Sequence, residues 1–203
     1  MRIGLVVDGQ SEVAALPKMF RRLEQETGHQ FLRPLLAPIQ PLAPPAAIAR
    51  TCSNRITQLT VRGAERILVL LDRETREECP GVFASQIEGA LALGSIETYV
   101  VVKNRTFENW LISDLGALLQ QPARFSVTNA MRQRVAPDRA DHVEDAFRML
   151  RHAAQGASYS KVADSQRILG FATPTAIALN SRSFRRFLRC SEHPSYVEQS
   201  RTA

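Results

Sequence analysis

Short apolar runs that alternate with helical segments constrain the fold of this chain more than any other feature. Residues 2–7 (RIGLVV), 66–71 (RILVLL) and 97–102 (ETYVVV) are rich in aliphatic and β-branched residues and are too short for buried helices, so each predicts a strand. A further apolar run, 31–39, contains prolines and predicts a short strand or an edge strand. We therefore expect about four strands.

Helices are expected between these strands, because apolar residues recur there at helical spacing. The expected helices cover about residues 13–23, 44–61 and 80–93, and Gly94 is the expected cap of the last one. Strands that alternate with helices form a parallel sheet covered on both faces. The predicted fold class is α/β, with a parallel sheet flanked by helices.

No strand is expected after Lys103. Helices are predicted instead at residues 107–121, 141–154, 161–169 and 181–190, with a polar, proline-containing stretch at 121–137. The chain then divides into an α/β core, residues 1–106, and a helical extension, residues 107–203, which packs on the core within a single compact domain.

The composition excludes several classes of protein. No apolar run approaches the roughly 18 residues that a membrane helix needs. The opening residues are those of a first strand, so a cytoplasmic protein is expected. The cysteines are odd in number and lack C-x-x-C spacing, which predicts neither a disulfide framework nor a structural zinc site. Glycine-rich nucleotide motifs are absent, and the four histidines have no ligand or catalytic spacing.

Acidic residues follow two of the predicted strands. Asp8 ends the first, and Asp72 and Glu74 end the one at 66–71. Because the carboxyl ends of parallel strands meet at one crevice, these side chains are expected to converge, and carboxylate oxygens are what Mg²⁺ prefers. If residues 72–74 are extended, Asp72 and Glu74 lean to the same side. An alternative stays open: strand-end acids, and Glu12 with them, also stabilise helix N-termini.

The chain is basic, with 26 basic and 20 acidic residues and a net charge of +6. A polyanionic partner fits this charge. The residues expected to contact the phosphates of DNA or RNA are Lys161, Arg182, Arg185 and Arg186. The alternative is that Phe184, Phe187 and Leu188 form an apolar helix stripe and leave the arginines as its ordinary solvated face.

Several ordered motifs resemble one family across nearly the whole chain. They are IGLVVDGQSE, LVLLDRE, ENWLISD, SYSK and SRSFRRFL. Together they resemble the standalone Toprim-like proteins, small proteins often encoded beside OLD-type or AAA ATPases in bacterial anti-phage loci. The resemblance implies a Toprim-like, Rossmann-like sheet with a helical C-terminal extension.

The resemblance also implies roles for individual residues. Asp8 would be a metal ligand or general base, Asp72 and Glu74 the main metal ligands, and Glu12 an accessory catalytic acid. It further implies that Glu108 faces the site as a metal ligand, whereas the residues alone favour a solvated Glu108 beside packed apolar neighbours. The family usually has glutamate where this chain has Asp8, and the shorter side chain retracts the carboxylate.

These observations predict a metal-dependent phosphodiester hydrolase that uses Mg²⁺ or Mn²⁺. The resemblance adds a nuclease that acts on DNA or RNA as the effector of an ATPase partner in anti-phage defence. Two alternatives remain: a Toprim-like regulatory or nucleic-acid-binding subunit that has lost turnover through Asp8, and a small-molecule phosphotransfer enzyme. The oligomeric state is left open.

Overall fold

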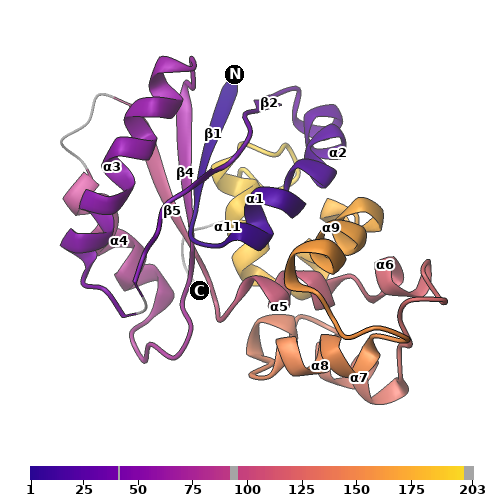
Figure 1. Cartoon of the computed structure of the whole chain (residues 1–203). Helices are drawn as coiled ribbons and strands as arrows, with labels where there is room; N and C mark the ends of the chain where they lie inside the picture. Colours follow the sequence, from indigo (N-terminus) through magenta and orange to yellow (C-terminus); the bar gives the residue numbers. More distant parts are fainter. Residues whose placement is uncertain (41, 92–95, 199–203) are drawn as a thin grey trace.

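The computed structural model describes residues 1–40, 42–91 and 96–198 (Figure 1). It contains one parallel sheet with the strand order β2-β1-β4-β5, and β3 pairs with the carboxyl end of β1. The strands are β1 (Arg2–Val7), β2 (Gln30–Phe31), β3 (Leu35–Leu36), β4 (Arg66–Asp72) and β5 (Glu97–Lys103). The prediction of an α/β, Rossmann-like fold with a parallel sheet is confirmed, and the proline-containing run yields only the two short strands β2 and β3.

Both faces of the sheet are buried, which explains why its strands are continuous apolar runs. Alternate residues of β1 and β4 belong to different clusters: Leu5 and Leu68 face one side, and Val6 and Val69 face the other. Helices α3 (Pro45–Val61) and α4 (Pro80–Leu91) cover the second side (Figure 1).

The first side is covered by helices from both ends of the chain. They are α1 (Gln10–Ala15), α2 (Pro17–Thr27) and α11 (Arg182–Cys190) (Figure 1). Helix α9 (Lys161–Phe171) packs against α1 and α2 and shares their apolar cluster. Phe184 and Phe187 of α11 share one apolar cluster with Leu5 and Leu68 of the sheet. The helical extension is therefore joined to the α/β core through a common interior.

Two expected helices are interrupted for local reasons. The helix expected at 13–23 breaks at Pro17, which lacks a backbone N–H and begins α2. The helix expected at 107–121 divides into α5 (Phe107–Ser113) and α6 (Leu115–Leu119), because the Asp114 carboxylate caps α6 by accepting from the Ala117 N–H.

The rest of the extension contains two helices that were not expected, α7 (Asn129–Val135) and α10 (Pro174–Asn180). The helix expected at 141–154 is present as α8 (Ala146–Ala153), and the short 3-10 helix η1 (Ala140–His142) precedes it. Thr128 and Thr173 cap α7 and α10 through their hydroxyls, a signal that precedes each helix in the sequence. The helix expected at 141–154 starts later, because the Asp141 carboxylate accepts hydrogen bonds from Ser181 and Ser183.

The expected end of a helix at Leu93 and its cap Gly94 lie outside the described residues. Among the helices of the described part of the chain, none is both long enough and apolar enough to span a bilayer.

Candidate metal centre

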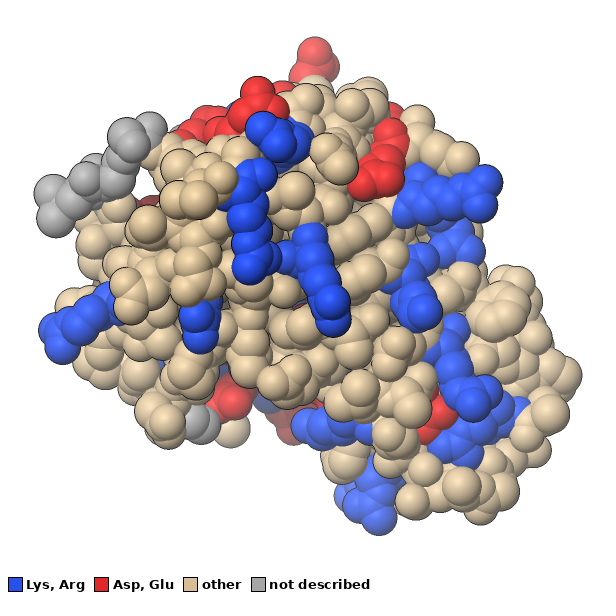
Figure 2. All heavy atoms as spheres, turned by 45° about the horizontal axis from the view of Figure 1, so that its top comes forward, with Lys and Arg blue, Asp and Glu red and all other residues tan. Residues whose placement is uncertain are grey.

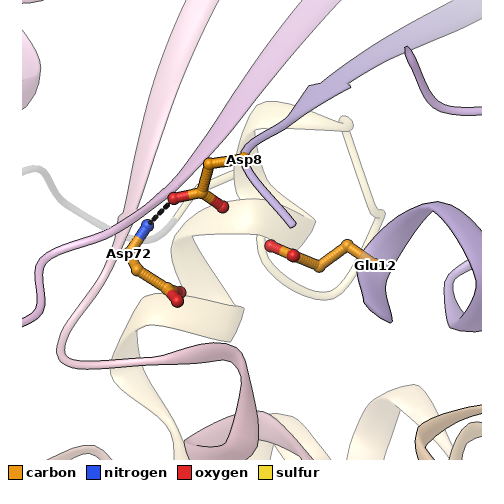
Figure 3. A group of neighbouring side chains, drawn as sticks. All are labelled: Asp8, Glu12 and Asp72. Atoms are coloured by element: carbon orange, nitrogen blue, oxygen red, sulfur yellow. Dashed lines mark hydrogen bonds between the residues drawn. The ribbon is translucent and has the colours of Figure 1, made fainter. Parts of the chain in front are cut away.

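Three carboxylates converge where β1 and β4 end. Asp8 follows β1, Asp72 is the last residue of β4, and Glu12 comes from the first turn of α1. One ligand atom from each lies within 4.8 Å of the others, and Figure 3 shows the three side chains pointing toward a common space. The predicted convergence of Asp8 and Asp72 is confirmed, and Glu12 joins them.

A backbone hydrogen bond fixes the two aspartates relative to each other. The Asp72 N–H donates to Asp8 Oδ2 at 2.6 Å (Figure 3). A hydrogen bond to an ionised carboxylate is stronger than one between neutral groups. Asp8 is therefore held by the neighbouring strand despite its short side chain.

Gly9 is required because there is no room for a side chain at this position, and not because of its backbone conformation. Its φ of −127° is in the extended region that any residue adopts. A Cβ at this position would instead collide with Oε2 of Glu12. The glycine therefore lets the Glu12 carboxylate approach the chain that carries Asp8.

Replacing Gly9 with alanine should displace the Glu12 carboxylate and lower the free energy of unfolding by about 1–3 kcal/mol, the usual cost of overpacking. Urea denaturation measures this change. Gly89→Ala is the matched control, because a Cβ at Gly89 of α4 meets nothing within 4 Å, and there alanine should stabilise the helix slightly. Equal effects of the two substitutions would contradict the close approach at Gly9.

A lysine that the sequence reading did not identify lies among the three acids. The Lys103 side chain is fully buried, and its Nζ lies 3.1 Å from Asp8 Oδ1 and 3.0 Å from Asp72 Oδ1, and also contacts Glu12. Lys103 ends β5 and pairs in register with Asp72 of β4. The sequence carries a signal for this lysine: it is a charged residue at the end of an apolar strand. The carboxyl ends of parallel strands lie at one edge of the sheet, so such a residue is expected near the acids that end the neighbouring strands.

Burial and mutual charge set the protonation of this centre. Burial raises the pKa of Asp8, but the Lys103 ammonium and the Asp72 N–H outweigh it and lower that pKa below its ordinary value. Burial raises the pKa of Glu12 well above its ordinary value against the opposing effect of Lys103. Burial, opposed by Lys103 and reinforced by Asp8, raises the pKa of Asp72 to about 7. The three carboxylates raise the pKa of Lys103, which stays charged.

The free energy of unfolding in EDTA should fall between about pH 5 and pH 7. An unfolded aspartate loses its proton near pH 3.9, whereas Asp72 keeps it to about pH 7 in the folded protein. The folded state therefore binds more protons in this window, so raising the pH favours unfolding. Glu12 contributes with the same sign.

Urea titrations across this pH range test the prediction. Asp72→Asn should flatten the pH dependence, because the amide has no proton to lose. A free energy of unfolding that rises through the window, or a slope that the substitution does not change, would contradict the raised pKa of Asp72.

The donors of this centre fit a hard divalent cation. Oδ1 of Asp72 is buried and has no hydrogen-bond partner, although it lies within ion-pair distance of Lys103. A buried carboxylate oxygen without a hydrogen bond is costly, and a cation would satisfy it. Asp8 and Asp72 also line a surface pocket, which gives access from solvent.

Glu74 does not join the three carboxylates. The expectation that residues 72–74 stay extended is wrong: β4 ends at Asp72, and Glu74 has a φ of 55° in the left-handed region. Its N–H donates to the Arg105 carbonyl at 2.8 Å, which holds this turn. The Glu74 side chain is exposed and lines the same pocket as Asp72.

Glu108 lies close to the centre but outside the three-carboxylate group. It is 4% exposed, so the expectation of a solvated side chain is wrong. Its charge contributes to the raised pKa of Asp72, and Nζ of Lys161 lies 3.4 Å from its Oε1. Lys161, which the sequence predicts to bind phosphate, is thus placed next to the acidic centre.

The predicted basic residues of α11 contact other parts of the chain. Arg186 pairs with Glu88 and donates to the Val100 carbonyl on β5, which closes the exposed edge of the sheet. Arg185 pairs with Asp138, and Arg182 is exposed at the start of the helix. The described contacts of Arg185 and Arg186 do not reach the acidic centre, and their role in nucleic-acid binding stays a prediction.

Basic side chains are widely distributed over the surface. On the face shown in Figure 2, Lys and Arg spread from the α/β core onto the helical extension rather than forming one patch. This distribution agrees with the net charge of +6.

A comparison with models of protein families gives a match over most of the chain. The family model described as "Domain of unknown function (DUF4276)" matches residues 7–190, which contain all the acids and the lysine of the centre. No curated protein and no solved structure matches the chain.

Proposed function

The chain belongs to the DUF4276 family, and from its acidic centre we propose that it is a metal-dependent phosphodiester hydrolase of the Toprim-like type. One observation carries the proposal: Asp8, Glu12 and Asp72 meet within 4.8 Å at the carboxyl ends of parallel strands. A buried oxygen of Asp72 is left there without a hydrogen bond. The resemblance of DGQSE and LDRE to Toprim-like motifs gives independent support.

Asp8 and Asp72 would hold Mg²⁺ or Mn²⁺, with Glu12 beside them. A divalent ion bound there supplies an activated water and neutralises charge on the phosphate. Glu74 and Glu108 lie outside this group. Glu74 lines the same pocket as Asp72, and the negative charge of Glu108 helps to raise the pKa of Asp72.

Lys103 and Glu12 have roles that follow from their protonation. The Lys103 ammonium is fixed by its three partners, so it can stabilise negative charge that develops on a phosphate without reorganising. Burial raises the pKa of Glu12 well above its ordinary value, which favours the protonated carboxyl that can give its proton to a leaving oxygen.

The substrate and partner are a further part of the proposal. The net charge of +6 favours a polyanion such as DNA or RNA. The resemblance to standalone Toprim-like proteins favours an OLD-type or AAA ATPase as the partner and a role in anti-phage defence.

A second candidate function is a Toprim-like regulatory or nucleic-acid-binding subunit without turnover. Lys103 favours it, because its ammonium already lies among the three acids and compensates their charge without a metal. The shorter carboxylate of Asp8, in place of the glutamate usual in the family, points the same way.

Cleavage of supercoiled plasmid and of total tRNA by the purified protein separates the two candidates. The hydrolase should cut at least one of them with Mg²⁺ or Mn²⁺, and EDTA should abolish the cleavage. Glu77→Gln, which removes an exposed acid outside the centre, should cleave like the wild type. Metal binding in calorimetry without cleavage, even when an ATPase encoded beside its gene is added, would establish the binding subunit instead.

A further inference from the structure

An aromatic ring on the helical extension has two cations close to it. Phe147 of α8 is half-buried and forms a T-shaped pair with Tyr159, with ring centroids 5.8 Å apart. Nζ of Lys161 lies 4.8 Å from the centroid of the Phe147 ring, and Cζ of Arg151 lies 5.9 Å from it. Aromatic faces bordered by Lys and Arg are the elements that bind bases and phosphates of unpaired strands.

This ring is connected to the acidic centre by a single side chain. Lys161, which contacts the Phe147 ring, also lies 3.4 Å from Oε1 of Glu108. Glu108 belongs to α5, which packs against both α8 and α9 (Figure 1). A strand that has a phosphate at Asp72 can therefore continue past Lys161 to Phe147.

The cations beside the ring can reach a phosphate. Arg151 is exposed and can turn away from the ring at little cost. The Lys161 side chain is 57% exposed and its ammonium has three N–H donors, so it can bind a phosphate while it keeps its ion pair with Glu108. A shift of either cation uncovers part of the ring. Exposed cation–π contacts contribute only about 0.5–1 kcal/mol, less than the stacking of a base.

We propose that Phe147, Lys161 and Arg151 form a binding path for a single-stranded polynucleotide, in which one base stacks on Phe147 and the two cations hold the flanking phosphates. The proposal rests on the hydrolase function, because it places the path beside the same centre. Only an unpaired base offers a free face to the ring, so a single strand binds in preference to a duplex.

Fluorescence anisotropy in EDTA tests the path without cleavage. The probes are a fluorescein-labelled oligothymidylate of about 16 nucleotides, within the range of known single-strand sites, and a labelled duplex of the same length. Wild-type protein should bind the single strand more tightly than the duplex. Phe147→Leu should weaken single-strand binding about tenfold, because leucine preserves apolar packing but cannot stack. Phe147→Tyr should bind like the wild type.

Charge variants complete the test. Arg151→Gln should weaken binding and reduce its salt dependence, because a phosphate contact is lost. Arg50→Gln removes an exposed arginine from α3, on the opposite side of the sheet, and should change neither. Thermal unfolding of each variant verifies that it is folded.

The outcomes distinguish this inference from the hydrolase proposal. Equal affinity of Phe147→Leu and wild type, equal or tighter binding of the duplex, or no binding of the single strand would overturn the path, whether or not the protein cleaves. A tenfold loss in Phe147→Leu that Phe147→Tyr restores supports the path, even if no substrate is cleaved with any metal.

Discussion

Replacing Lys103 with methionine should lower the free energy of unfolding by about 3–5 kcal/mol at pH 7 in EDTA, the usual result of removing one partner from a buried charge cluster. The Lys103 side chain is fully buried, and the side chains of Asp8 and Glu12 are 15% and 3% exposed. Methionine fills a similar volume but leaves these carboxylates without a cation. Their ionised forms then have no compensation for the loss of water.

The loss should depend on pH. At pH 5 Asp72 is protonated in the wild type, whereas near pH 7 it is partly ionised, so fewer charges depend on Lys103 at pH 5 and the difference in stability between the proteins shrinks. Lys18→Met is the matched control, because Lys18 is exposed on α2 and its replacement should change the free energy of unfolding by no more than about 0.5 kcal/mol. Urea denaturation at the two pH values measures both proteins. A Lys103→Met protein as stable as the control at pH 7 would show that the buried carboxylates do not depend on the charge of Lys103.

Replacing Asp72 with asparagine should reduce metal-dependent cleavage by at least about 100-fold, since altering the groups that merely orient a metal's ligands already costs 10–100-fold. Asp72 supplies the buried oxygen without a hydrogen bond, and its backbone N–H holds Asp8. The substitution keeps the backbone hydrogen bond and the size of the side chain. The loss of cleavage therefore measures the effect of removing the carboxylate charge of Asp72.

Metal-induced stabilisation gives an independent measure of the same residue. Mn²⁺ should raise the melting temperature of the wild type and have a much smaller effect on Asp72→Asn. Asp72→Asn should also melt at a higher temperature than the wild type in EDTA at pH 8, because the wild type must then ionise a carboxyl whose pKa is raised by burial. Full cleavage by Asp72→Asn, or an unchanged rise in melting temperature with Mn²⁺, would show that Asp72 does not bind the metal.

The position of Asp8 shows how tertiary contacts can compensate for a local change. Its carboxylate is shorter than the glutamate usual at this point in the resembled family. The Asp72 N–H and the Lys103 ammonium both contact it, so its two oxygens are fixed by β4 and β5. The geometry of the three carboxylates thus depends on three neighbouring strands rather than on one motif.

The strands, their parallel arrangement and the positions of Asp8 and Asp72 can be predicted from the amino-acid sequence. Each of these follows from local patterns: apolar runs of strand length, and acids at the residue where a strand ends. The break before α2 was also readable at Pro17. Such features depend on the backbone preferences of a few consecutive residues.

The surroundings of the two aspartates depend on contacts between segments that are distant in the sequence. Lys103 reaches them because β5 pairs with β4 in the register that aligns Lys103 with Asp72, and pairing between distant segments is not encoded in either run alone. Glu74 turns away because the chain leaves the strand at Asp72. Burial, which raises the pKa of Glu12 and Asp72, arises from helices packed over the sheet, so the chemistry of the centre exists only in the folded chain.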